Sequence, residues 1–170
     1  RLSDDSSNAA FVPVNRYNIL KPIIAGGFNK DDGFLLGLGF KYTHQGFRKV
    51  PYASVNRMIL FHSFATSAFK LKYSGEWLHV LGNTDIIANA DIFAPENTQN
   101  FFGRGNETEF YKTGNYQKYY RVRFSFFQLT PAFRWRNKKK GMMLSVGPSL
   151  QHYRFDSSDN KGRFISNGAY

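Results

Sequence analysis

Hydrophobic and polar residues alternate with a period of two along most of this chain. The alternation is clearest in residues 33–44, where even-numbered positions from Phe34 to Tyr42 are apolar or aromatic and odd-numbered positions, apart from Leu35, are small or polar. Successive side chains of a β-strand point to opposite faces. The pattern therefore predicts a strand with one apolar face and one face of small or polar residues.

Similar segments predict about seven or eight strands, each of roughly ten residues, with no helix. They are residues 17–28, 33–44, 53–65, 67–81, 84–93, 118–126, 127–136 and 141–155. In residues 67–81, His79 shares a side with the apolar positions Phe69 to Trp77. Residues 29–33 are typical of a tight turn, in which Asp31 and Asp32 are interpreted as turn formers and not as a catalytic pair.

One connection, residues 94–117, is too long for a simple turn and too rich in Gly and Asn for a strand. It is the predicted functional loop, folded against a wall of strands. The candidate residues in it are Phe101, Phe102, Gly103, Arg104, Gly105, Asn106, Glu107 and Thr108. Three regions follow: a linker or mobile arm at 1–16, a transmembrane β-barrel segment at 17–155, and a loop or truncated end at 156–170.

Strand length and the polar side chains favour an antiparallel transmembrane barrel over a soluble sandwich. Sandwich strands are commonly about five or six residues long, whereas about nine to eleven residues cross a bilayer at a tilt. Charged residues in the middle of a strand would be buried at a high free-energy cost in a small closed core, but a water-filled lumen accommodates them. The candidate basic lumen consists of Lys70, Lys72, Arg121, Arg123, Arg134 and Arg136.

Composition narrows the function classes. The chain of 170 residues has 18 Phe, 10 Tyr, no Cys and a net charge of +11, and no apolar run is long enough for a transmembrane helix. The four His residues are widely spaced and no Gly-x-Ser-x-Gly motif occurs, so we expect no enzyme, no metal and no cofactor. The net charge suggests an anionic partner, but no nucleic-acid-binding motif is present.

Three stretches resemble barrels of the bacterial surface antigen superfamily, the BamA/TamA type. Residues 100–109, NFFGRGNETE, resemble the family's FFG-G-N-T signature. Residues 20–40 and 63–77 look like an early hairpin and the region of the third and fourth strands. The resemblance spans roughly residues 17–125 and implies a barrel of about sixteen strands, of which this chain would be a part.

The resemblance implies a bacterial outer-membrane protein that assembles or translocates other outer-membrane proteins, or that anchors a fused periplasmic domain such as a metallophosphoesterase. Expected partners are the lipid bilayer, lipopolysaccharide, unfolded client proteins and periplasmic domains absent from this chain. Two alternatives stay open: a small porin-like barrel whose basic lumen attracts anions, and a soluble β-sandwich that binds acidic ligands.

Overall fold

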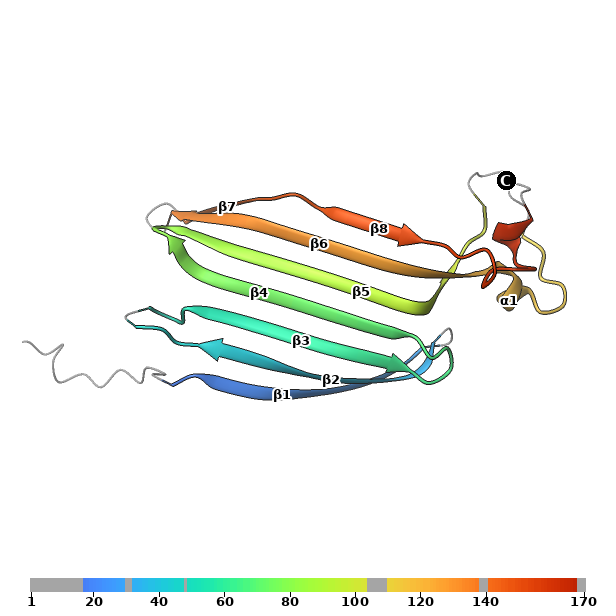
Figure 1. Ribbon diagram of the computed structural model, residues 1–170, viewed down its shortest axis with the longest axis horizontal. Helices are drawn as coiled ribbons and strands as arrows, with labels where there is room; N and C mark the ends of the chain where they lie inside the picture. Colours follow the sequence, from blue (N-terminus) through green and yellow to red (C-terminus); the bar gives the residue numbers. More distant parts are fainter. Residues whose placement is uncertain (1–16, 30–31, 48, 104–109, 138–140, 168–170) are drawn as a thin grey trace, which may run out of the picture.

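The computed structural model describes residues 17–29, 32–47, 49–103, 110–137 and 141–167. Over these residues the chain is mostly β and forms one large antiparallel sheet (Figure 1). Its strands are β1 (Ile19–Asn29), β2 (Gly33–His44), β3 (Ser54–Ser63), β4 (Phe69–Leu81), β5 (Thr84–Asn100), β6 (Arg121–Asn137), β7 (Met142–Val146) and β8 (Leu150–Arg154). The helix α1 (Tyr116–Tyr120) precedes β6, and the 3₁₀ helix η2 (Phe164–Ser166) follows β8. None of the helices in the described part has the length and apolarity to cross a membrane.

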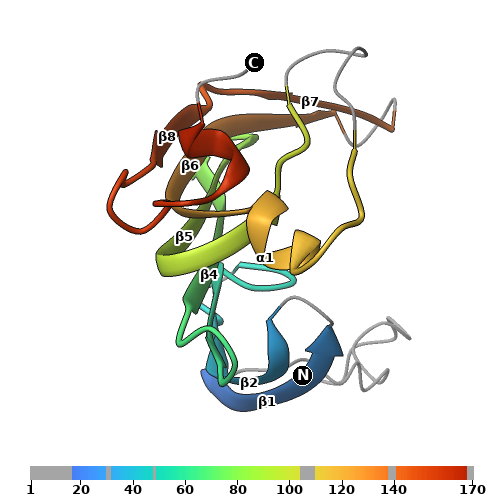
Figure 2. The ribbon, with the colours of Figure 1, turned by 90° about the vertical axis from the view of Figure 1, so that its right-hand side faces the viewer.

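The sheet is a meander in which each strand from β1 to β6 pairs with the next. β7 and β8 both pair with β6, at Phe133 to Asn137 and at Ser125 to Leu129, so they occupy one strand position in two halves. The break between them contains Gly147, which lies so close to β6 that an added Cβ would be 2.0 Å from the Pro131 carbonyl oxygen. The sheet is curved, as Figure 2 shows, but it is not closed into a barrel.

The pairing register separates two faces. One, which we call the apolar face, consists of Leu20, Pro22, Ile24, Gly26 and Phe28 of β1, Phe34, Leu36, Leu38, Phe40 and Tyr42 of β2, Asn56, Met58, Leu60 and His62 of β3, Phe69, Leu71, Tyr73, Gly75 and Trp77 of β4, Ile86, Ala88, Ala90 and Ile92 of β5, Phe127, Leu129, Pro131, Phe133 and Trp135 of β6, Met142, Leu144 and Val146 of β7, and Leu150 and His152 of β8. None of these residues is Asp, Glu, Lys or Arg, but at one end of the sheet the same side continues to Arg121 and Arg123 of β6 and to Arg154 of β8. The face is nevertheless open, since Ile24, Leu38 and Leu144 are 78%, 57% and 61% exposed.

The opposite side of the sheet, the polar face, carries most of the charged residues of the strands and the better-buried apolar residues. Ile59, Leu78 and Phe126 are buried there. Small residues of this face let neighbouring side chains lie over them: an added Cβ on Gly37 would meet the ring of Phe61 at 2.5 Å. The positions that the sequence pattern marks as small or polar therefore lie on the side of the sheet where side chains of neighbouring strands pack against one another.

Several predicted boundaries were wrong. The predicted loop 94–117 begins too early, because β5 runs on to Asn100 after a register shift between Phe93 and Asn97. The predicted strands 118–126 and 127–136 form the single strand β6, preceded by the five-residue helix α1. The predicted strand 141–155 is divided into β7 and β8. The turn after β1 agrees with prediction at Gly33, whose φ of 69° suits glycine.

Candidate functional site: the polar face and its cap

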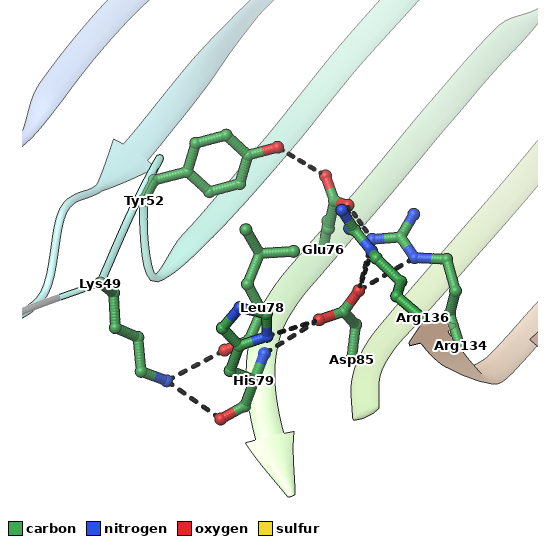
Figure 3. A network of polar contacts seen from close by, with 8 residues as sticks. All are labelled: Lys49, Tyr52, Glu76, Leu78, His79, Asp85, Arg134 and Arg136. Carbon is green, nitrogen blue, oxygen red and sulfur yellow. Dashed lines mark hydrogen bonds and ion pairs between the residues drawn. The ribbon is translucent and has the colours of Figure 1, made fainter. Parts of the chain in front are cut away.

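An ionic network occupies the end of the polar face where β4, β5 and β6 lie side by side (Figure 3). Arg134 contacts the carboxylate of Glu76, and its Nη2 lies 3.0 Å from Asp85 Oδ2. The Nε and Nη2 of Arg136 lie 2.6 Å from Asp85 and 3.1 Å from Glu76. Two carboxylates and two guanidinium groups therefore neutralise one another, and the Asp85 side chain is completely buried.

Residues from outside the sheet complete the network. Tyr52, in the connection between β2 and β3, donates a hydrogen bond of 2.8 Å to Glu76. Burial raises the pKa of the Tyr52 phenol, and this hydrogen bond acts in the same direction. Lys49 of the same connection donates to the carbonyl oxygens of Leu78 and His79, at 2.9 and 3.4 Å. The connection is thereby fastened to the end of β4.

His79 departs from the side that the sequence pattern predicts for it. The pairing of β4 with β5 shifts between Trp77 and Leu81, and His79 adopts a positive φ of 52°. As a result its backbone N–H donates to Asp85 at 2.9 Å, and its ring Nδ1 lies 3.5 Å from the same carboxylate. A bulge has turned the residue away from the apolar face, which strict alternation cannot anticipate.

At the other end of the sheet, Lys70 and Lys72 are also paired. Lys70 Nζ lies 2.5 Å from Asp32, and Thr98 Oγ1 lies 3.4 Å from the same carboxylate. Asp32 is 3% exposed and so does more than form a turn, because it links the β1–β2 connection to β4 and β5. Lys72 and Asp91 form a looser pair at 3.9 Å.

The six residues of the candidate basic lumen are therefore not brought together. Lys70 and Lys72 lie near one end of the sheet, whereas Arg134 and Arg136 lie near the other. β6 is one strand, so regular alternation separates the odd-numbered Arg121 and Arg123 from the even-numbered Arg134 and Arg136. The sequence pattern had treated these segments as two strands with independent phases, and the basic lumen stays a prediction.

The candidate loop supplies part of an aromatic cap at the end of β5 and β6. Phe101 contacts the ring of Phe164, with centroids 6.1 Å apart, and Phe102 contacts Phe110 and Tyr120 at 5.2 and 5.3 Å. Tyr120 and Phe164 are buried. The two phenylalanines thus act as packing anchors, and Gly103 follows them with a φ of 105°. Arg104, Gly105, Asn106, Glu107 and Thr108 lie outside the described residues, as does Asp31.

A second group of basic residues lies on the polar face and was not predicted. In the register of the sheet, Lys21 of β1 is directly opposite Lys41 of β2, and Lys41 is directly opposite Arg57 of β3. All three side chains are exposed. We call Lys21, Lys41 and Arg57 the cationic row. Sequence alternation places each on the polar parity, but only strand pairing shows that they are neighbours.

The described residues contain no cluster of three or more His, Asp or Glu side chains that could hold a metal ion. Comparison with known proteins adds no assignment: no family model, curated protein or solved structure matches the chain. The resemblance to BamA/TamA-type barrels therefore stays a prediction.

Proposed function

We propose that this chain is part of the wall of a transmembrane β-barrel in the bacterial outer membrane, with its apolar face against lipid tails and its polar face toward water. The observation that carries the proposal is the exposed apolar face, which extends over all eight strands and is uncharged except at the end where Arg121, Arg123 and Arg154 lie. Apolar surfaces much larger than a few hundred Å² are rare on soluble monomers. Acyl chains would cover this one without a second protein layer.

Strand length and aromatic placement support the same proposal. The strands β1 to β4 have 11, 12, 10 and 13 residues, enough to cross a bilayer at a tilt. Trp77 and Trp135 lie on the apolar face near the ends of β4 and β6. Tryptophan in such positions suits the interface between lipid tails and head groups.

From the open edges we infer that, within a bilayer, this sheet would be part of a larger barrel. A sheet edge exposes unpaired N–H and C=O groups, which a bilayer cannot satisfy. Further strands must therefore pair with β1 and with β7 and β8. In line with the resemblance, we propose a BamA/TamA-like barrel that assembles or translocates outer-membrane proteins or anchors a periplasmic domain, with lipopolysaccharide, clients or that domain as partners.

The alternatives receive less support. The porin-like reading relied on six basic residues, but Lys70, Lys72, Arg134 and Arg136 are paired with carboxylates, which weakens their attraction for solutes. A soluble sandwich needs a second layer over the apolar face. Within the described residues, no such layer covers it, since the strands form a single sheet.

The two tryptophans of the chain test the proposal directly, because both lie on the apolar face. The chain would be reconstituted into vesicles of brominated phosphatidylcholine, whose acyl chains quench tryptophan on contact. We expect strong quenching of Trp77 and Trp135. As a control, a variant with both changed to Phe and with Asn89→Trp on the polar face should be quenched much less. Equal quenching of both proteins, or a sheet that folds in buffer and ignores the vesicles, would contradict the proposal.

A further inference from the structure

The cationic row is unusual because like charges face each other across two strand pairs. Lys21 pairs with Lys41, and Lys41 with Arg57, so the row crosses β1, β2 and β3 at one level. Directly opposite residues of antiparallel strands have Cβ atoms about 4.5–5.5 Å apart, and like charges there are destabilising. With strands about 4.8 Å apart, the backbone positions of the row span about 10 Å.

No acid of the described residues neutralises the row. The ion pairs found there involve Lys70, Lys72, His79, Arg134, Arg136 and Arg154 as the basic partners. The side chains of Lys21, Lys41 and Arg57 make no hydrogen bond or ion pair to any described residue. The other basic residues of the polar face show that this chain can pair its charges, so the row is a local excess of positive charge.

A hollow adjoins the row on its β4 side. It has a volume of about 370 Å³ and is bordered by Arg57, Ser74, Asn89, Lys72 and Asp91, among others. Ser74 lies directly opposite Arg57, and Asn89 directly opposite Ser74. These two polar residues therefore continue the line of the cationic row across β4 and β5. Their hydroxyl and amide groups can donate hydrogen bonds to an oxyanion. The single carboxylate at the rim, Asp91, is directed to Lys72 at 3.9 Å.

We propose that the cationic row and this hollow form a binding site for a small oxyanion with several negative charges, of the pyrophosphate or phosphate-ester class. Lys21, Lys41 and Arg57 supply the charge, and Ser74 and Asn89 supply neutral donors. The volume of the hollow and the span of the row favour a small anion over an acidic protein segment. The site requires only that the polar face is wet, so it does not depend on the barrel.

The test is to titrate pyrophosphate into the full chain, folded in detergent micelles, and to measure the heat of binding by calorimetry. A charge-assisted hydrogen bond contributes about 1.5–3 kcal/mol, or roughly a tenfold or greater factor in affinity. We therefore expect saturable binding, weakened at least tenfold by Lys41→Gln and retained by Lys41→Arg. The matched double variant Lys112→Gln/Lys118→Gln removes two positive charges from exposed residues outside the row, and should bind within about twofold of the parent.

Each result decides the proposal. Absence of saturable binding, or equal weakening by the Lys112/Lys118 control, would overturn it, since the second result would indicate attraction by net charge alone. Tighter binding of a Glu-rich peptide than of pyrophosphate would assign the row to an acidic protein segment instead. Because Lys41→Gln removes a repulsion, the variant should keep its sheet, as circular dichroism would check. The tryptophan experiment is independent: the barrel proposal can fail there while the anion site is upheld here.

Discussion

Two groups of basic residues on one face of the sheet show how pairing decides what a charge does. Arg134 and Arg136 lie within hydrogen-bonding distance of Glu76 and Asp85 and form a neutral, largely buried network. Lys21, Lys41 and Arg57 lie on the same face, with one another and the neutral Ser74 as cross-strand neighbours. The first group stabilises one end of the sheet, whereas the second keeps its charge available. Residue type alone does not distinguish them.

The largest expected effect comes from breaking the neutral network. Arg134→Met would leave Glu76 and Asp85 with Arg136 as their nearest cation, and removing one partner of a buried ion pair commonly costs about 3–5 kcal/mol. We expect a loss of about 3 kcal/mol in the free energy of unfolding, measured by urea titration in micelles. The contrasting variant is Asp91→Asn in the exposed Lys72–Asp91 pair, which should cost less than about 1 kcal/mol. Similar losses of stability in both variants would show that the network contributes no more than an exposed ion pair.

A smaller effect of opposite sign is expected from neutralising the cationic row. Ser74→Asp places a carboxylate directly opposite Arg57, and an opposite-charge pair in this position contributes about 0.2–1 kcal/mol. The same carboxylate should compete with an oxyanion for Arg57. We therefore expect a slightly more stable sheet that binds pyrophosphate more weakly, whereas Ser74→Asn should change neither property appreciably. A destabilised Ser74→Asp variant would mean that Arg57 is already neutralised.

An effect of intermediate size concerns the space on the polar face. An added Cβ on Gly39, which lies between the row and Gly37 along β2, would be 2.1 Å from the Met58 carbonyl oxygen, whereas an added Cβ on Gly27 meets nothing within 4 Å. Gly39→Ala should therefore destabilise the β2–β3 pair by about 1–2 kcal/mol. Gly27→Ala should be nearly neutral. Thermal unfolding of the two single variants compares them, and equal midpoints would contradict the close approach of β2 and β3.

Much of the strand content could be predicted from the sequence. The predicted strand 33–44 has the same bounds as β2, and residues 53–65 contain β3. The period-two pattern also assigned the apolar residues of β2 and β4 to one side, with His79 as the exception. These features are local, because side-chain direction along a strand follows from backbone geometry alone.

The candidate site was predicted less well because it depends on which strands pair and in what register. Alternation identified Glu76, Asp85, Arg134 and Arg136 as polar positions, but their meeting requires β4, β5 and β6 to align. The cationic row was missed for the same reason, and the continuous strand β6 displaced Arg121 and Arg123 from the surface predicted for them.

The sequence by itself thus determined a mostly β chain with one apolar and one polar side, since apolar and polar residues alternate with the period of two of a β-strand. Tertiary structure decided the rest. Register selected the charge partners, the bulge at His79 and the break at Gly147 set where alternation fails, and the pairing pattern left the edges at β1 and at β7 and β8 open. Each of these depends on contacts between segments far apart along the chain, which a local pattern does not encode.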